Sequence, residues 1–526
     1  MEVSLKDLLG RGYFPKELPP CFTTRQFAQI VLENPSVQSL PKNKVEFEPI
    51  KYGLTLPGPW VRNLMIVHPA AQIWISKAIV DNREEIFSKI NIGSLSLSKP
   101  TVSKRRALHT ERSGAEVAHK RMELQPLGRY YLKCDVAAFY SSIYTHSLAW
   151  AMHGKSVAKV ERYNKNMAGN LLDFCVQRGT AGQTSGIPVG PDTSLVLAEL
   201  ILAAVDRELV EQVGGLNGFR FMDDYFFVFE NRSDAERVLN VLSLCLGEFE
   251  IGLNSQKTEL DVIPAEIERP WVTELQKAYS NLTSRGGTDC SNYFSTAIDL
   301  KRKFPSELVF RYALGQIANG NIDRFRSRDN ELLNFIMMAV RSEMGSLRVV
   351  FQILVEFFST TKNSSILLSK LTGRLLLDLE YVSAVLNSHI KWAAAARFDH
   401  ELIWSLWVLL YFKAAISEDV LRVVVTYPHP LLKILILWGQ AESRIVLEGG
   451  FESCFVKGDV DKEENWIACY EAKRRDWVDC ESDFINDSEL FDLLEENEVS
   501  FFEPDLSQLV EDDEEDDEEG DRFANY

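Results

Sequence analysis

The sequence predicts an α+β domain followed by an all-helical domain and an acidic tail. Between Tyr130 and about Pro264, short β-rich runs alternate with runs of helical periodicity, which is typical of a domain that mixes strands and helices. From there to about Leu447, apolar residues recur every three or four positions, which indicates a stack of helices in which any repeat is degenerate. Residues 511–519 are acidic without interruption, so this stretch repels itself and has little to bury.

The composition is that of a globular protein and gives no sign of a membrane span. Hydrophobic residues make up 46% and charged residues 25% of the chain. The most apolar stretches, residues 402–412 and 431–438, are shorter than the ~20 residues that a span needs. The first residues lack a basic region followed by an apolar core, and the eight cysteines form no C-x-x-C pair. We therefore expect a cytoplasmic protein with reduced thiols.

The net charge of −19 comes from the end of the chain. Of the 76 acidic residues, 20 lie in residues 481–526, where only one of the 57 basic residues is found. The rest of the chain is therefore neutral, and its overall charge does not exclude nucleic-acid binding. Residues 99–133 hold nine Lys or Arg against three acids, which fits either a nucleic-acid patch or a solvated loop.

The first part of the chain predicts one clear strand and one clear helix. Residues 1–60 are rich in proline and lack periodicity, so we expect an irregular lead-in there. The apolar run at residues 64–67 predicts a strand, and the pattern after Pro69 predicts a helix.

Asp135 stands at the end of a predicted strand. It follows the run Tyr131-Leu132-Lys133-Cys134 and precedes the aromatic pair Phe139-Tyr140. A carboxylate that leaves a strand in this way could face another acidic group on a neighbouring strand. A simple strand-end cap would also explain the residue.

The adjacent carboxylates Asp223 and Asp224 lie between two aromatic, strand-forming runs. Neighbouring residues on a straight strand point to opposite faces, and burying either charge unpaired would be costly. A hairpin with the two aspartates at its tip avoids this cost, and a nearby cation would neutralise them. Asp-Asp turns also occur in ordinary hairpins, so this pair alone leaves both interpretations open.

Two glycine-containing segments flank the aspartate pair. Residues 182–194 contain Gly190, run into a predicted helix with Asp and Ser/Thr at its start, and would let the backbone approach a base pair closely. Residues 252–258 contain Lys257, which could give a proton or a charge to a triphosphate or simply be a surface lysine.

The order of these motifs resembles reverse transcriptases. Asp135 and Asp223 are 88 residues apart, which suits the palm of such an enzyme. Within that family, three passages look like the bacterial abortive-infection and antiphage-defence reverse transcriptases: residues 11–20, 142–147 and 186–194.

The resemblance implies fingers and a palm, followed by a helical domain in place of an evident thumb. The division that we expect is residues 1–129 for an N-terminal extension and fingers, 130–265 for the palm, 266–450 for the helical domain and 451–526 for an acidic, largely disordered region.

The resemblance also implies a site for two Mg²⁺ ions, with Mn²⁺ as an alternative. Asp135 and Asp223 would be direct ligands and Asp224 a less direct one, with Val136 completing the metal set. Three carboxylates supply the hard oxygen ligands that such ions prefer, and the ions would serve in-line nucleotidyl transfer.

Further positions would contact the nucleotide. Tyr140 would be the steric gate that crowds a 2′-hydroxyl and so favours deoxynucleotides. Arg62 resembles a finger arginine that reaches the triphosphate, Lys257 matches the lysine after the hairpin, and Gly190 lies in the motif that approaches the nucleotide.

The activity implied is that of an RNA-directed DNA polymerase in antiphage defence, with deoxynucleoside triphosphates as substrates and DNA as product. Val189 replaces the usual glutamine and the finger arm lacks the usual Lys-Gly hairpin, so either copying of an RNA or template-free synthesis from a protein hydroxyl remains open. The resemblance also implies an oligomer, with a noncoding RNA or a partner reverse transcriptase. The alternative is an inactive polymerase-like scaffold that binds RNA or a partner. The acidic tail is either a solubility tail or a mimic of DNA.

Overall fold

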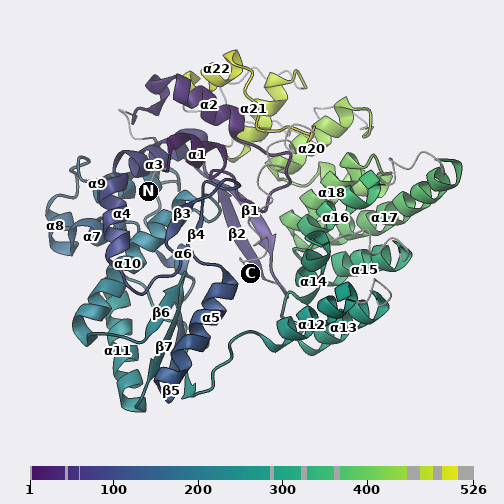
Figure 1. The fold of residues 1–526 in the computed structure, drawn as a ribbon. Helices are drawn as coiled ribbons and strands as arrows, with labels where there is room; N and C mark the ends of the chain where they lie inside the picture. Colours follow the sequence, from purple (N-terminus) through teal and green to yellow (C-terminus); the bar gives the residue numbers. More distant parts are fainter. Residues whose placement is uncertain are drawn as a thin grey trace.

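The computed structural model describes residues 3–41, 45–58, 60–284, 290–320, 329–360, 368–446, 463–477 and 488–506. A half that mixes strands and helices lies beside an all-helical half (Figure 1). The predicted order, an α+β domain followed by a helical domain, is confirmed.

A four-stranded antiparallel sheet in the order β6-β7-β5-β8 forms the centre of the mixed half. Its strands are β5 (Tyr130–Asp135), β6 (Gly218–Phe221), β7 (Asp224–Phe229) and β8 (Glu259–Val262). Alternate side chains of β7 point to opposite faces, as strand geometry requires. Tyr225 and Phe227 join the main core, while Phe226 and Val228 join a second, smaller cluster. The sheet is therefore covered on both faces.

The helices on the two faces come from different parts of the chain. On the main-core face, α11 (Arg232–Glu248) contacts β5 and β7 and packs against α10 (Thr193–Val213). On the other face, Val117 and Leu124 of α5 (Gly114–Leu124) complete the smaller cluster. Short helices connect β5 to α10: α6 (Phe139–Ser142), α7 (Ser147–His153), α8 (Lys155–Val160) and α9 (Ala168–Arg178).

A two-stranded hairpin precedes this sheet and contacts both halves of the molecule. It pairs β1 (Ile50–Thr55) with β2 (Val61–Ile66) and leads into α3 (Pro69–Asp81). The strand and helix expected around residues 64–81 are thus present. The neighbouring elements are α4 (Arg83–Ile92), β3 (Pro100–Val102), β4 (Leu108–Thr110) and the 3₁₀ turn η2 (Gln125–Leu127).

The irregular lead-in expected for residues 1–60 is wrong. This region forms α1 (Leu5–Gly10), α2 (Arg25–Glu33) and the 3₁₀ turn η1 (Pro35–Gln38) before β1 begins. The side chain of Ser4 accepts a hydrogen bond from Asp7 N, and that of Asp7 from Ser4 N, so a reciprocal cap starts α1. The prolines stand beside or at the start of these elements, where no helical N–H is lost.

The helical half docks on the β1–β2 hairpin. Asp399 at the start of α18 (Asp399–Tyr411) accepts a hydrogen bond from Gly53 N at 2.9 Å, and His400 pairs with the Tyr52 hydroxyl at 2.8 Å. The other helices of this half are α12 (Pro270–Ser284), α13 (Cys290–Lys303), α14 (Val309–Ala318), α15 (Asp329–Ser342), α16 (Leu347–Thr360), α17 (Leu368–Ala396), α19 (Glu418–Val425) and α20 (Pro430–Ala441).

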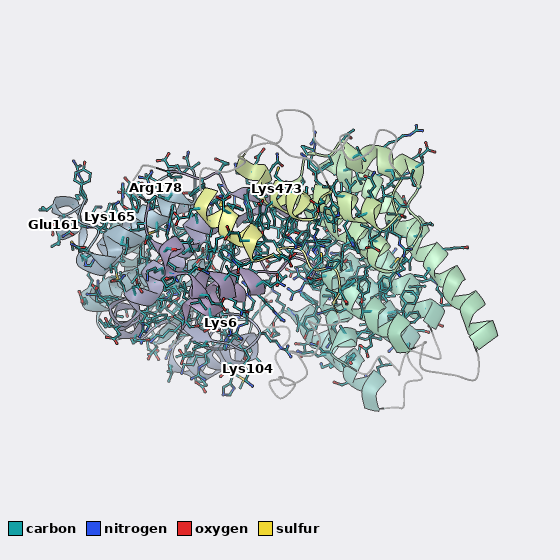
Figure 2. The ribbon with its side chains drawn as sticks, turned by 90° about the horizontal axis from the view of Figure 1, so that it is seen from above. Lys6, Lys104, Glu161, Lys165, Arg178 and Lys473 are labelled. Carbon is teal, nitrogen blue, oxygen red and sulfur yellow. The ribbon has the colours of Figure 1, made fainter. Side chains whose placement is uncertain are left out.

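The segment expected to be largely disordered is partly folded. It contributes the 3₁₀ turn η6 (Glu463–Asn465), α21 (Trp466–Arg474) and α22 (Ser488–Glu496), and seen from above these yellow helices lie between the two halves (Figure 2). Phe501 and Phe502 are each 0% exposed. The acidic C-terminal region also contains aromatic residues, and burying their apolar surface favours folding. A count of charges alone does not reveal this contribution. Residues 507–526, with the unbroken acidic run, lie outside the described residues.

Two other expectations concern the whole chain. No helix among the described residues is long and apolar enough to cross a membrane. The six cysteines in the described part of the chain are buried and form no disulfide with one another.

Phe501→Ala should destabilise the fold by ~3–5 kcal/mol, the usual cost of truncating a buried phenylalanine. Its ring lies 5.2 Å from that of Trp466 and 5.5 Å from that of Phe27, centroid to centroid, so it joins α21 to α2. Urea unfolding measures the loss. Trp60→Ala, at a side chain that is 69% exposed, is the control and should change little. An equal, small effect of both substitutions would contradict the packing described here.

Candidate active site

The end of β5 and the turn between β6 and β7 bring the three predicted aspartates together. Asp135 is the register partner of Asp224 across the β5–β7 pair. Asp223 lies on the turn, where its carbonyl accepts a hydrogen bond from Val136 N at 3.1 Å. The hairpin tip expected from the sequence is therefore present, and it faces the strand end that carries Asp135.

The turn is held in place by Arg220, a buried arginine that the sequence analysis did not single out. Its guanidinium binds Glu199 at 2.7 Å and Asp206 at 2.8 Å, and both carboxylates lie on α10. The same guanidinium donates to the carbonyl of Met222 at 2.9 Å, while Met222 N donates to the Ser98 hydroxyl at 2.7 Å. Because Met222 has a positive φ of 54°, these two bonds stabilise a backbone shape that side chains rarely adopt.

A signal for this cluster exists in the sequence. Arg220 alternates with phenylalanines on a short strand, so one face of that strand carries a charge that must be paired if buried. Glu199 and Asp206 are two helical turns apart in an otherwise apolar helix and therefore share a face. These two patterns together could have paired the strand with the helix.

Asp135 is held by two polar side chains from the segment before β8. Lys257 Nζ lies 2.9 Å from Asp135 Oδ2, and Asn254 Nδ2 donates to Asp135 Oδ1 at 3.1 Å. The Asp135 side chain is 10% exposed, whereas that of Lys257 is 64% exposed. The lysine can thus leave the pair at little cost, while the aspartate is fixed.

Burial and neighbouring carboxylates raise the pKa values of Asp223 and Asp224. Burial first, and then the charges of Asp224 and Asp135, raise the pKa of Asp223 to about 6. The hydrogen bond from Lys257 to Asp135 is the main cause of the raised pKa of that lysine. The site therefore concentrates negative charge that one lysine does not fully neutralise, as expected where a cation binds.

The donor atoms suit Mg²⁺ in kind. Carboxylate and carbonyl oxygens are the hard ligands that this ion takes, and the only donor atom left on Val136 is its carbonyl oxygen, because its N–H is used by Asp223. Among the described residues, however, no three Asp, Glu, His or Cys side chains already stand close enough together to form a metal cluster. Lys257 and a metal ion would compete for the negative charge of Asp135.

Tyr140 lies beside the turn that carries Asp223. It is partly buried and borders a small hollow with Glu199, Leu202 and Met222. Burial first, and then the negative charge of Asp223, raises the pKa of its hydroxyl. The position is close to the aspartates, as the proposed gate requires.

Arg62 and Gly190 belong to other segments than the aspartates. The side chain of Arg62 is exposed on β2, and its charge acts on the hydroxyl of Tyr140, as does that of Asp223. Gly190 has a φ of +126°, and a Cβ there would lie 2.6 Å from Pro15 Cγ. The need for glycine at this position is therefore explained by packing on the N-terminal segment.

Arg220→Ala should destabilise the protein by ~3–5 kcal/mol, because it leaves Glu199 and Asp206 buried without their cation. Arg232→Ala is the matched control, since its pair with Glu236 is exposed and should contribute no more than ~1 kcal/mol. Urea unfolding of the two variants measures the difference. Similar midpoints for both variants would be inconsistent with the buried cluster.

Lys257→Ala should strengthen binding of Mn²⁺, used as a probe ion, by up to about fivefold, which corresponds to the ~1 kcal/mol of an exposed ion pair. The reason is that the lysine competes with a cation for Asp135. Titration followed by electron paramagnetic resonance measures the affinity, with the exposed Lys6→Ala as control. Weaker binding after loss of Lys257 would show that the lysine assists the ion instead.

Part of the chain is similar to a known protein family, and the chain has weak similarity to solved structures. Residues 77–276 match the family "Reverse transcriptase (RNA-dependent DNA polymerase)", whereas no curated protein matches the chain. Among solved structures, telomerase from Candida albicans in complex with a TWJ fragment of telomeric RNA is 12% identical, with a TM-score of 0.30 over 66% of this chain and 71% of that one. Apo telomerase from Candida tropicalis is 12% identical, with a TM-score of 0.30 over 79% of this chain and 69% of that one. The three aspartates lie within the segment that is similar to this family.

Proposed function

We propose that the protein is a DNA polymerase of the reverse transcriptase type, which adds deoxynucleotides at Asp135, Asp223 and Asp224. The observation that carries the proposal is the pairing of Asp135 with Asp224 across two strands, with Asp223 on the adjoining turn. The family match over residues 77–276 supports the same activity.

Two Mg²⁺ ions, when bound, would activate the attacking hydroxyl and neutralise the triphosphate and the leaving pyrophosphate. Asp135, Asp223 and the carbonyl of Val136 would hold them, with Asp224 beside them. The new bond joins the hydroxyl oxygen to the α-phosphorus, the bond from that phosphorus to the pyrophosphate breaks, and the hydroxyl proton passes to solvent.

Lys257 would have two roles, one before the metal ions bind and one during nucleotidyl transfer. Its ammonium lies 2.9 Å from Asp135 Oδ2 and neutralises that carboxylate. Once released, the exposed lysine is free to contact the phosphates, where a flexible ammonium serves as a point charge. Arg62, whose side chain is exposed and whose charge acts on Tyr140, would add a second cation from the fingers.

We further propose a role in bacterial antiphage defence, in the cytoplasm. This role rests on residues 11–20, 142–147 and 186–194, which look like those of abortive-infection and antiphage-defence reverse transcriptases. The polymerase would act as an oligomer and with a noncoding RNA or a partner reverse transcriptase. It would either copy that RNA or extend a protein hydroxyl without a template.

A second candidate is an inactive polymerase-like scaffold that binds RNA or a partner protein. The observation in its favour is that Lys257 occupies Asp135 and that no metal cluster is preassembled among the described residues. The two candidates differ in one measurable property, which is incorporation of nucleotides.

Purified protein should incorporate labelled deoxynucleotides in the presence of Mg²⁺. Asp223→Ala/Asp224→Ala and Asp135→Ala should each lower the rate by ~1000-fold or more, a loss of ~4 kcal/mol of transition-state stabilisation. Asp261→Ala is the control, because this aspartate lies exposed on β8 of the same sheet and should leave the rate unchanged.

The assay is run with and without copurified or added RNA, and the product is sequenced and treated with protease. Sequence identity to an RNA would identify a template, and a protease-sensitive product would identify a protein primer. The same variants, expressed in bacteria challenged with phage, test the defence role. No incorporation under any of these conditions, with protection that survives loss of the aspartates, would favour the scaffold.

Tyr140→Ala should lower the preference for deoxynucleotides over ribonucleotides by about tenfold or more, a change of ~1.4 kcal/mol in discrimination. The reason is that the ring would no longer crowd a 2′-hydroxyl. Competition between labelled dATP and ATP measures the ratio, with the exposed Tyr163→Ala as control. An unchanged ratio would remove Tyr140 from the gate.

A further inference from the structure

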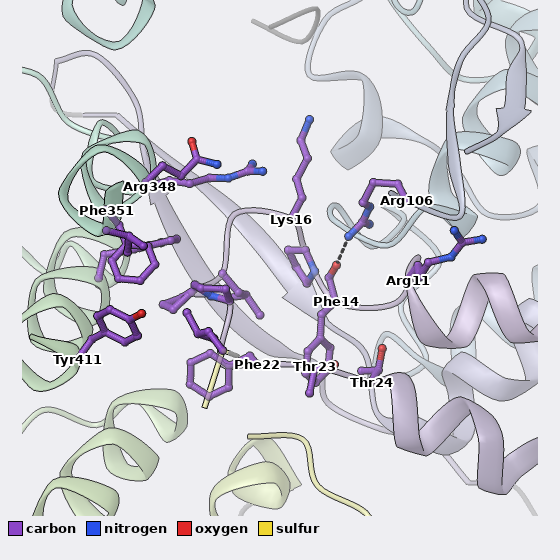
Figure 3. Close-up of a pocket in the computed structure, with 18 of the residues that line it drawn as sticks. Arg11, Phe14, Lys16, Phe22, Thr23, Thr24, Arg106, Arg348, Phe351 and Tyr411 are labelled. Carbon is purple, nitrogen blue, oxygen red and sulfur yellow. Dashed lines mark hydrogen bonds between the residues drawn. The ribbon is translucent and has the colours of Figure 1, made fainter. Parts of the chain in front are cut away.

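A cavity of about 700 Å³ lies between the N-terminal segment and the helical half. Residues 10–24 form one wall, and side chains of α16 and α18 form the opposite wall (Figure 3). None of the three aspartates of the candidate active site borders it, and neither does Lys257. The cavity is therefore a separate site on the molecule.

The described lining of the cavity carries more basic than acidic side chains. Arg11, Lys16, Arg106 and Arg348 border it against one acidic residue, Glu356, and two of the arginines are ion-paired, Arg11 with Asp7 and Arg106 with Asp192. Arg106 is held in place because its Nε donates to Asp192 at 3.1 Å and its Nη1 to the carbonyl of Phe14 at 2.9 Å. A fixed guanidinium of this kind is a preorganised donor for an anion.

Lys16 is a cation of the lining that makes no side-chain hydrogen bond or ion pair with any described residue. Its exposed side chain lies between those of Arg106 and Arg348 (Figure 3). The surrounding protein lowers its pKa by displacing water, and Arg348 and Arg106 lower it further against the opposing effect of Glu17. Holding these cations together costs free energy that a bound anion would return.

The wall opposite the cations is apolar and aromatic. The rings of Phe351 and Tyr411 lie 5.0 Å apart, and Trp404 is fixed because its Nε1 donates to the carbonyl of Glu17 at 2.8 Å. The Tyr411 hydroxyl and the Gln352 amide, which also line the cavity, make no side-chain hydrogen bond in the part of the chain that is described. Aromatic faces beside unused polar groups are suited to a planar heterocycle.

We propose that this cavity binds one nucleotide unit, with its phosphates on Lys16 and the neighbouring arginines and its base toward the aromatic wall. Its volume falls within the ~300–1000 Å³ of pockets for ligands of this size. The nucleotide is either free or part of a single strand, because both present the same phosphate and base. The site needs neither the aspartates nor a metal ion, so it goes beyond the proposed polymerase activity.

One other occupant has the right charge. Leu506 borders the cavity, and the acidic run of residues 511–519 follows it in the chain. Carboxylates would satisfy the cations but would leave the aromatic wall and the free amide of Gln352 without a matching group. The observations therefore favour the nucleotide, and the experiment includes the acidic segment as a competitor.

The test uses the full-length chain with Asp223→Ala/Asp224→Ala, in EDTA, so that the palm cannot bind a nucleotide through metal ions. Fluorescence anisotropy measures binding of labelled dATP, of a short labelled oligodeoxynucleotide and of a labelled peptide of residues 507–526. Lys16→Glu should weaken nucleotide binding by about tenfold or more, since it turns an attraction into a repulsion. Lys6→Glu makes the same charge change at an exposed side chain of α1. Lys6 is labelled in Figure 2, and its substitution should change binding less than about twofold.

Lys16→Gln and Gln352→Ala guard against a folding defect, and each should weaken binding while leaving the urea midpoint unchanged. An azido-dATP probe should crosslink to residues 10–24 or to α16 and α18. Binding of dATP alone identifies a free nucleotide, whereas tighter binding of the oligonucleotide identifies a strand. If neither probe binds in a manner that depends on Lys16, or if only the peptide does, the proposal is overturned. Because the aspartates are absent throughout, this result is independent of whether the protein polymerises DNA.

Discussion

The buried guanidinium of Arg220 is the interaction on which the geometry of the site depends. Removing an arginine from water is costly, and only good pairing with Glu199 and Asp206 offsets that cost. Those two carboxylates lie on the longest helix of the mixed half, α10, while the third partner is the carbonyl of Met222 in the hairpin turn. One side chain therefore fixes the turn to the helix, and with it the position of Asp223.

A fixed turn has an electrostatic consequence. Asp223 and Asp224 cannot move away from Asp135, because the strand register and the bond from Val136 N hold them. The repulsion between these carboxylates is relieved by Lys257, which is exposed and flexible. The protein thus keeps its acidic groups rigid and its neutralising cation mobile, which allows the cation to be exchanged for another.

The local features of this site could be predicted from the sequence, whereas the long-range ones could not. The strand that ends at Asp135 and the hairpin tip at Asp223 follow from runs of aromatic and β-branched residues. The helices before residue 40 were missed because the prolines concealed short, well-capped segments. The packing of Phe501 and Phe502 was missed because their partners, such as Phe27 and Trp438, are far away in sequence. The pairing of Arg220 was indicated in the sequence, but only by two separate patterns: a charged residue on an apolar strand and two acidic residues on an apolar helix.

The cationic cavity could not have been predicted because three separate segments build it. The N-terminal segment is held against the mixed half by Asp192, whose N–H donates to the carbonyl of Gly12 at 2.7 Å. The helical half is held against the same segment by Trp404, through its bond to Glu17. Lys16 and Glu17 are adjacent, so one bond that fixes Glu17 also fixes where Lys16 enters the cavity. The docking of the helical half on the β1–β2 hairpin thus does more than join the two halves, since it places Arg348 on one side of Lys16 and Arg106 on the other (Figure 3).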